Sequence, residues 1–188
     1  MRNLEHLAKS RCVWALDLPG CGDSALPPQV SDADSLAPFV GKVLDQAFEG
    51  QAVDVMGFSF GGLTAGLLAA EKPGLFKQMV MVGIPALGLF EKTLPMRGMT
   101  PNMDEQQQRA VHRHNLVSMM FAHESSASEE VIDLQIHNVS RDRLRKRRIA
   151  RTDVLLGLQD RWACPVHGIW GAKDALYKST LERVPQVL

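Results

Sequence analysis

The sequence of 188 residues contains little of what marks several large classes of protein. Its three cysteines, Cys12, Cys21 and Cys164, are odd in number and widely spaced, which fits neither a disulfide framework nor a zinc site. A reducing compartment is the simpler expectation, so we expect a cytoplasmic protein. No apolar run approaches the length of a transmembrane helix, and the first residues lack the hydrophobic centre of a signal peptide.

An excess of one charge is also missing. Lysine and arginine together number 21, and aspartate and glutamate together also number 21. This balance argues against a protein that mainly binds nucleic acid or an anionic membrane surface. The content of 45% hydrophobic and 22% charged residues is that of an ordinary globular protein, long enough for one domain with a sizeable core. We see no indication of a metal or an organic cofactor.

Apolar runs that alternate with helical patterns predict an α/β fold. Three runs have the composition of strands buried in a parallel sheet: C-V-W-A-L-D-L (12–18), V-D-V-M (53–56) and Q-M-V-M-V-G-I (78–84). Helical spacing of apolar or small residues lies between them, over 31–47 and 64–71. The order strand, helix, strand, helix, strand implies parallel pairing with right-handed crossovers. Trp14 and Trp170 fall on expected strands and should pack in the core.

The pattern changes after residue 84. Residues 85–160 lack strand-like runs and predict loops and helices, one opening near Asn102 and another within 125–130. The run C-P-V-H-G-I-W-G (164–171) then returns to strand and turn. We therefore expect three parts: a core segment (1–84), a helical lid (85–160) and a return to the core (161–188). A lid of this kind would cover the carboxyl ends of the strands, where ligands bind in open α/β sheets.

The stretch V-D-V-M-G-F-S-F-G-G (53–62) gives the strongest functional signal. Its G-F-S-F-G lies between an expected strand and an expected helix, which is the context of a nucleophile elbow. Gly57 and Gly61 are expected to let the backbone crowd around the turn. Ser59 would expose its hydroxyl there, and the Phe60 N–H would favour developing negative charge at the helix N-terminus. The alternative is an ordinary turn rich in glycine and serine.

Three segments, in this order, resemble the lid-bearing branch of the α/β-hydrolase family. D-L-P-G-C-G-D-S (17–24) is similar to the family's D-x-x-G-x-G-x-S loop, V-M-G-F-S-F-G-G (55–62) to its nucleophile elbow, and V-H-G-I-W-G-A-K-D (166–174) to its acid-bearing strand end. The resemblance implies a mostly parallel sheet with flanking helices. It also implies hydrolysis of a small carboxylic ester, or of a related acyl, thioester or carbon–carbon bond. A serine at the elbow argues against the haloalkane dehalogenase branch.

The same resemblance implies a Ser-Asp-His triad. Ser59 would be the nucleophile, Phe60 would supply half of the oxyanion hole, and Asp174 would orient the histidine. The family order places that histidine after the acid, yet no histidine follows Asp174 and the last one is His167. The second oxyanion donor and one strand, expected between the Val13 and Val53 strands, are missing as well.

We therefore expect a fragment with an incomplete core, an open sheet edge after the Ile169 strand, and little or no esterase activity. A catalytically inactive remnant of the fold, or a relative that binds a ligand or a protein, is the alternative interpretation. A small ester or acyl molecule is the expected partner, and the oligomeric state stays open.

Histidines elsewhere offer weak substitutes for the missing base. His112, His114 and His123 fall in the expected lid, from which one could reach Ser59, but surface histidines without a catalytic role are far more common. His167 is expected to pack within its strand.

The strongest charge run is R-D-R-L-R-K-R-R-I-A-R (141–151). Its simplest interpretation is a solvated lid helix. A sharper hypothesis is that Arg141 or Arg143 points inward and pairs with a substrate carboxylate, as in relatives that cleave carbon–carbon bonds of dienedioic acids. One basic segment on a neutral chain, with no aromatic platform, disfavours a role in nucleic-acid binding.

Overall fold

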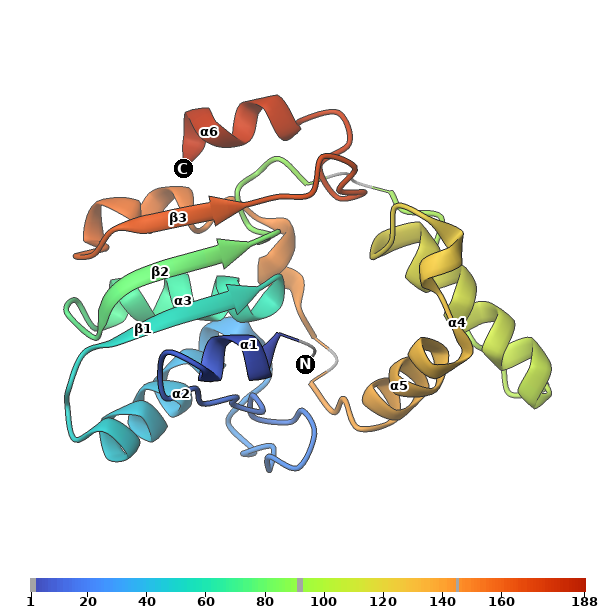
Figure 1. Ribbon diagram of the computed structural model, residues 1–188, viewed down its shortest axis with the longest axis horizontal. Helices are drawn as coiled ribbons and strands as arrows, with labels where there is room; N and C mark the ends of the chain where they lie inside the picture. The colour runs from blue at the N-terminus through green and yellow to red at the C-terminus, as the bar shows by residue number, and fades with distance from the viewer. Residues whose placement is uncertain (1–2, 91–92, 145) are drawn as a thin grey trace.

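The computed structural model describes residues 3–90, 93–144 and 146–188, and a three-stranded parallel sheet lies at its centre (Figure 1). The strands are β1 (Val53–Phe58), β2 (Phe76–Val82) and β3 (Val166–Ile169), in the order β1-β2-β3. Helix α2 (Ala33–Phe48) precedes β1, and α3 (Phe60–Glu71) connects β1 to β2. The predicted α/β class, with a parallel sheet and flanking helices, is confirmed.

One face of the sheet packs against α3, and α2 packs against α3 in turn. Met79 and Met81 of β2 point to this face and are fully buried. Leu63 and Leu68 of α3 are buried as well. Helix α3 is apolar around most of its circumference, as expected for a helix enclosed between a sheet and other elements. This apolar layer is the core, and it fixes the position of the turn that joins β1 to α3.

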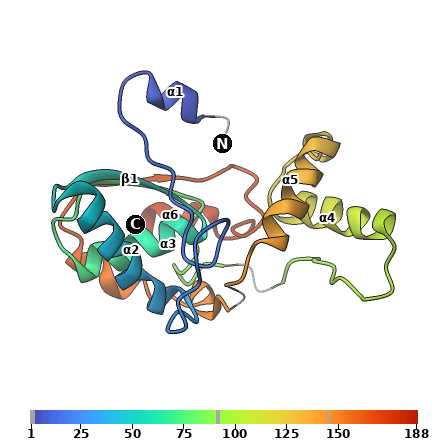
Figure 2. The same cartoon turned by 90° about the horizontal axis from the view of Figure 1, so that it is seen from below.

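The other face of the sheet is largely open. The strand register aligns Met56 with Val80 and His167, and Phe58 with Val82 and Ile169, so these side chains share one face. Met56, Phe58 and Ile169 are 53%, 56% and 52% exposed. In Figure 2 helices α2 and α3 lie on one side of the sheet, while α1 (Leu4–Ala8) stands off on the other.

The prediction of a strand over residues 12–18 is wrong. This segment is irregular and pairs with no strand in the described part of the chain. Trp14 is 66% exposed, which overturns its expected place in the core, and it meets Phe48 edge to face at 5.4 Å. Arg11 forms an ion pair with Asp54 of β1 at 3.4 Å. An apolar run becomes a strand only where a neighbour accepts its backbone hydrogen bonds, and no described strand lies beside this one.

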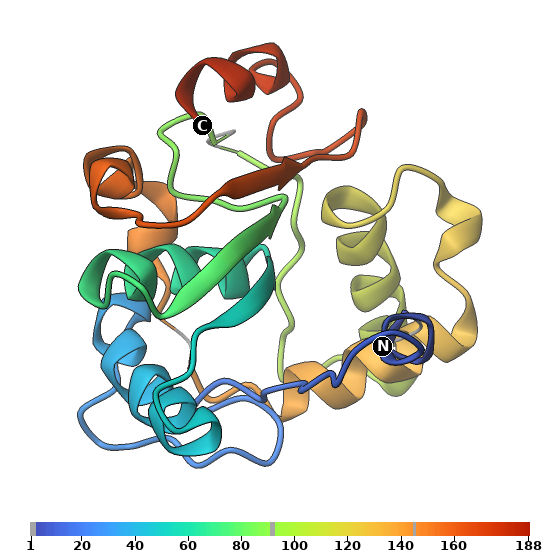
Figure 3. The ribbon, with the colours of Figure 1, turned by 60° about the vertical axis from the view of Figure 1, so that its left-hand side comes forward.

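The helices predicted within residues 85–160 are confirmed as α4 (Glu105–Met119) and α5 (Glu129–Ser140), and no strand occurs between residues 93 and 144. The α4 N-cap is Asp104, whose carboxylate accepts the Gln107 N–H at 2.8 Å while the Gln107 side chain accepts from Asp104 N–H. Ser128 caps α5. Figure 3 shows these two helices crossing each other, apart from the sheet.

The basic run from residue 141 to residue 151 is not the helix that was expected. It is irregular over its described first part and forms the short 3₁₀ helix η2 (Arg148–Arg151). The remaining short elements are η1 (Glu124–Ser126), η3 (Leu156–Arg161), η4 (Leu181–Arg183) and α6 (Val184–Val187). Within the described ranges, no helix has the length and apolar character needed to cross a membrane.

Candidate active site

Ser59 lies at a sharp turn between β1 and α3. Its φ and ψ angles are +49° and −118°, a conformation that is uncommon for a residue with a side chain and costly to hold. Hydrogen bonds fix this turn from both sides. The Ser59 N–H donates to the Val82 carbonyl at 2.8 Å, and the Gly62 and Leu63 N–H groups donate to the Ser59 carbonyl at 3.0 and 3.1 Å.

Gly57 and Gly62 allow the close approach on which this turn depends. A Cβ on Gly57 would lie 2.4 Å from the Cα of Gly62, and a Cβ on Gly62 would lie 2.8 Å from the Gly57 carbonyl oxygen. The sequence assigned this role to Gly57 and Gly61. Gly61 has open space around the position of a Cβ, so the expectation for Gly61 is wrong. The second glycine of the pair, Gly62, is the one that the turn requires.

Phe60 begins α3 immediately after Ser59. The first N–H groups of a helix have no acceptor within the helix, and they lie at the positive end of its dipole. The Phe60 N–H is therefore suited to donate a hydrogen bond to an anion beside the Ser59 side chain. Its ring is half-buried against the core, and the guanidinium of Arg147 lies over it, 4.7 Å from the ring centroid.

Asp174 follows β3 at the same edge of the sheet. Its Oδ1 accepts the Leu176 N–H at 2.9 Å, and its Oδ2 is 3.2 Å from where a Cβ would stand on Gly83, the residue that follows β2. Gly83 has a φ of +51°, and its N–H donates to the Ile169 carbonyl at 2.8 Å. Burial raises the pKa of the Asp174 carboxyl. Ser59, Gly83 and Asp174 thus come directly after, or a few residues after, the three strands.

Tyr177 holds the segment that carries Asp174. Its side chain is fully buried, and its hydroxyl donates to the carbonyl of Ile84, two residues beyond β2. Burial, together with the nearby Asp174 charge, raises the pKa of the phenol. Trp170 meets the Tyr177 ring edge to face at 6.0 Å. No sequence pattern pointed to Tyr177, although it is the one tyrosine of the sequence and lies eight residues after the end of β3.

The histidines do not complete this arrangement. Within the described residues, no hydrogen bond joins a histidine to Ser59 or to Asp174. His114 on α4 lies with its Nε2 2.6 Å from the Pro95 carbonyl, and burial lowers the pKa of His112 on the same helix. His167 is exposed on β3 rather than packed, which corrects that expectation.

The loop from Asp17 to Ser24 is closed by its own side chains. The Ser24 hydroxyl donates to the Asp17 carbonyl at 2.6 Å, and Asp17 Oδ2 accepts the Asp23 N–H at 3.2 Å. Gly22, with a φ of +52°, has no room for a Cβ, which would lie 2.1 Å from Asp17 Oδ2. The D-x-x-G-x-G-x-S pattern is therefore a self-supporting loop.

Arg141 and Arg143 contact this loop. Arg141 forms an ion pair with Asp23, while Arg143 donates to the Gly22 carbonyl at 3.2 Å and to the Ser24 carbonyl. That either arginine binds a substrate carboxylate stays a prediction. Among the residues the structure describes, no cluster of histidine, cysteine, aspartate and glutamate could hold a metal ion.

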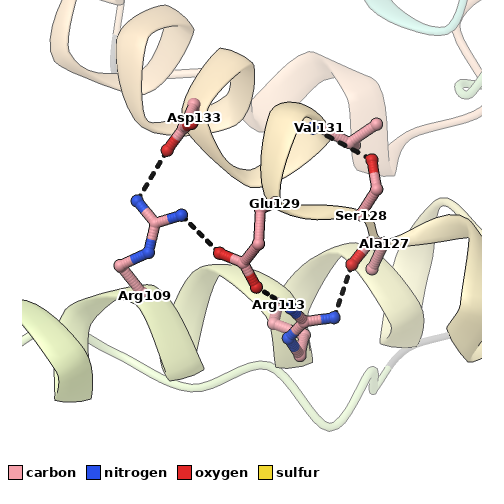
Figure 4. A network of polar contacts seen from close by, with 7 residues as sticks. All are labelled: Arg109, Arg113, Ala127, Ser128, Glu129, Val131 and Asp133. Atoms are coloured by element: carbon pink, nitrogen blue, oxygen red, sulfur yellow. Dashed lines mark hydrogen bonds and ion pairs between the residues drawn. The ribbon is translucent and has the colours of Figure 1, made fainter.

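An open groove of about 620 Å³ lies between α4 and α5, away from Ser59. Figure 4 shows the ion pairs beside it: Arg109 donates to Glu129 at 2.5 Å and to Asp133 at 2.6 Å, and Arg113 donates to Glu129 and to the Ala127 carbonyl. Each guanidinium is already engaged by carboxylate or carbonyl oxygens of the chain. These contacts join the two helices to each other.

A family model described as alpha/beta hydrolase fold matches residues 1–176. The chain belongs to the α/β-hydrolase family. This α/β-hydrolase is 26% identical over 184 residues to the pimeloyl-[acyl-carrier protein] methyl ester esterase of Chromobacterium violaceum, and the alignment covers 93% of this chain and 70% of that protein.

Solved structures share the α/β-hydrolase fold at lower identity. A Burkholderia cenocepacia structure described as an aryl esterase has a TM-score of 0.65 at 18% identity, over 90% of this chain and 65% of that one. An N-acyl homoserine lactonase, AidH, has a TM-score of 0.56 at 18% identity, over 87% of this chain and 63% of that one. The chain thus spans less than two thirds of either structure. The family and these relatives are hydrolases.

Proposed function

We propose that Ser59 is the nucleophile of a serine hydrolase that acts on a small carboxylic ester, or on a related acyl, thioester or carbon–carbon bond. The observation that carries the proposal is the backbone of Ser59, held at a φ of +49° in a strand-to-helix turn that two glycines make possible. A strained turn of this kind presents the serine hydroxyl to substrate in a nucleophile elbow. Strain persists at a functional site when the surrounding structure over-determines it.

In the proposed reaction, Ser59 Oγ attacks the carbonyl carbon and its proton passes to a general base. The carbonyl oxygen becomes an oxyanion, to which the Phe60 N–H would donate. The tetrahedral intermediate then collapses, and the leaving oxygen takes the proton back from the base and departs as an alcohol. The acyl group left on Ser59 is removed by water, which the same base activates. Asp174 would orient the histidine that serves as base. Its carboxyl lies beyond the end of β3, the edge at which ligands bind in open α/β sheets.

The substrate class is supported by the relatives. One is a methyl ester esterase that acts on a pimeloyl group attached to acyl-carrier protein, and another is a lactonase of N-acyl homoserine. Both names describe cleavage of a carboxylic ester, a methyl ester in the first and a cyclic ester, the lactone, in the second. We accordingly propose a small carboxylic ester as substrate. We also propose residues 85–160 as a lid over the site, and Arg141 or Arg143 as a contact for a substrate carboxylate.

A second candidate is a non-catalytic member of the fold. The observation in its favour is that, among the residues the structure describes, no histidine is hydrogen-bonded to Ser59 or to Asp174, so no described histidine is in place as the base. Such a protein would keep the turn at Ser59 and bind a ligand without turning it over. The two candidates differ in whether the Ser59 hydroxyl reacts.

A fluorophosphonate probe tests this difference. The probe phosphonylates an activated serine in a single displacement, so it reports the nucleophile and the oxyanion donor without requiring turnover. Imidazole added to the buffer would serve as the base. We expect labelling on the peptide that contains Ser59 in the wild-type chain and none in Ser59→Ala, by intact mass and peptide mapping. Equal labelling of the two proteins, or labelling elsewhere only, would contradict the proposal.

A further inference from the structure

The residue that precedes η2, Arg147, lies directly over the side chain next to the proposed nucleophile. Its guanidinium carbon is 4.7 Å from the centroid of the Phe60 ring, within the range of a cation–π contact. Arginine and phenylalanine here are far apart in the sequence, and Arg147 belongs to the segment that returns from α5 to the core. No other described element places a charged side chain on this ring.

Arg147 is held in place by its own segment. Its Nη2 donates to Asp142 Oδ2 at 2.6 Å, and the other carboxylate oxygen of Asp142 accepts the Leu144 N–H at 3.1 Å. Leu144 is buried against Gly20, and the Arg143 N–H donates to the Gly20 carbonyl at 2.8 Å. The guanidinium therefore has a fixed position relative to both the 17–24 loop and the sheet.

One atom of the Arg147 side chain is left without a partner. Its Nε is buried and donates to no acceptor among the described residues. A buried donor without an acceptor is costly, and each such group in a native structure calls for an explanation. The ion pair with Asp142 and the cation–π contact with Phe60 hold the guanidinium in this position despite that cost.

We propose that Arg147 is a positioning residue for the oxyanion donor. By packing on the Phe60 ring it fixes the peptide between Ser59 and Phe60, whose N–H would bind the oxyanion. The core restrains the far side of this turn through Gly57 and Gly62, and Arg147 restrains the Phe60 side chain. The inference rests on the proposed function, because it assigns a purpose to a contact with the residue that follows the nucleophile.

The test measures the second-order rate constant for fluorophosphonate labelling of Ser59, with imidazole present, beside the melting temperature. Arg147→Met keeps an apolar stem but removes the charge and the planar group. We expect labelling to slow by about 10-fold to 100-fold, as displacements of catalytic groups do, while the melting temperature changes by less than about 4 °C. Arg147→Lys keeps a charge for Asp142 but lacks the planar face, and we expect a similar loss of labelling at near wild-type stability.

A double-mutant cycle separates positioning from general stability. In a Phe60→Leu background the ring is absent, so Arg147→Met should cause no further loss of labelling. The matched control is Arg109→Met, which removes an arginine bound to two carboxylates on the α4–α5 pair and should leave the labelling rate unchanged.

If Arg147→Met and Arg147→Lys are both labelled at the wild-type rate, the inference is overturned while the proposed function stays intact. Additive losses in the cycle would overturn it too, because Arg147 would then act without Phe60. If Arg147→Met does not fold, Arg147→Lys decides by the same criterion. If the wild-type chain itself is not labelled at Ser59, the proposed function fails and the inference fails with it.

Discussion

The backbones of Gly57 and Gly62 touch behind Ser59, so that a Cβ on Gly57 would lie 2.4 Å from the Gly62 Cα. The end of β1 and the first turn of α3 are thereby pressed together, and Ser59 is left to turn the chain at a positive φ. Backbone contact of this kind cannot be relieved by a side chain changing its rotamer. The geometry of the proposed nucleophile thus depends on two positions that carry no functional group.

Gly62→Ala tests this dependence. A Cβ on Gly62 would lie 2.2 Å from Ile84 Cγ2 and 2.8 Å from the Gly57 carbonyl oxygen. Because the second contact is with backbone, we expect a loss of about 3 kcal/mol in the free energy of unfolding, at the upper end of the range for overpacking. Gly61→Ala is the matched control, since nothing lies within 4 Å of its Cβ position, and alanine favours the helix by up to ~1 kcal/mol. Urea unfolding measures both, and equal losses would contradict the assignment.

The open face of the sheet predicts self-association. Met56 and Ile169 lie on this face at the two edge strands and are 53% and 52% exposed. Exposed apolar patches and unpaired strand edges promote aggregation. We expect dynamic light scattering to report particles that grow with protein concentration, and we expect Met56→Lys and Ile169→Lys to suppress this growth.

Leu134→Lys provides the control for that experiment. Leu134 is 57% exposed on α5, away from the sheet. The substitution adds the same charge to the protein without altering the open face. Suppression by Leu134→Lys equal to that by Met56→Lys would show that net charge, rather than the sheet face, governs the association.

The partly buried carboxyl of Asp174 should make the stability of the fold depend on pH. Burial raises the pKa of its carboxyl in the folded state, so the folded chain binds the proton more tightly than the unfolded chain. Its stabilising contribution is therefore fully present below the unfolded pKa of about 3.9 and is lost as the pH rises through the folded pKa. We expect Asp174→Asn to be more stable than the wild type at pH 7.

The advantage of Asp174→Asn should shrink as the pH is lowered towards the usual range of a carboxyl. Urea unfolding at several pH values measures it, and asparagine keeps an oxygen that can accept the Leu176 N–H. A difference between the two proteins that does not change with pH would mean that the charge of Asp174 carries no stability cost.

How far the sequence predicts this structure depends on the range of the interaction involved. β1, α3 and β2 follow from local pattern, and Ser59 was found because its turn is encoded within ten residues. The strand expected around Val13 does not form, since strand formation depends on a distant neighbour that local composition does not report. The sequence analysis chose Gly61 instead of Gly62. The motif marks Gly61, whereas the close contact is between the backbone of Gly57 in β1 and that of Gly62 in α3, which only the packing of the two elements determines.

The Arg147 contact with Phe60 was beyond sequence analysis for the same reason. The basic run from 141 to 151 attracts attention by its charge, and charge alone favours a solvated helix. In the structure its arginines are distributed among separate acceptors: Arg141 binds Asp23, and Arg147 binds Asp142. Which arginine meets which partner is determined by the path of the chain after α5, for which the sequence contains no periodic signal.

We predict that apolar burial contributes more to the stability of the α4–α5 pair than its ion pairs do. Ile132 of α5 is 1% exposed, whereas the Glu129 side chain, which bridges Arg109 and Arg113, is 66% exposed. Ile132→Ala should cost about 2–4 kcal/mol of unfolding free energy through the cavity it leaves. Glu129→Gln should cost less, and its effect should fade in high salt because exposed pairs are screened. A larger and salt-insensitive loss at Glu129 would reverse this ranking.

The relation between Ser59 and a general base gives a prediction for the 188-residue chain. Among the described residues no histidine is hydrogen-bonded to Ser59, so no described histidine is in place to take the proton of its hydroxyl. We expect the 188-residue chain to hydrolyse 4-nitrophenyl acetate at no more than a small residual rate, since loss of a triad member leaves roughly 10³–10⁴-fold acceleration over water. Imidazole in solution can diffuse to an open site and act as the base. The wild-type rate should therefore rise with imidazole more steeply than the rate of Ser59→Ala, which measures the background reaction of imidazole itself. Parallel slopes would remove Ser59 from the chemistry, and robust turnover without imidazole that depends on Ser59 would show that one of the histidines present already serves as the base.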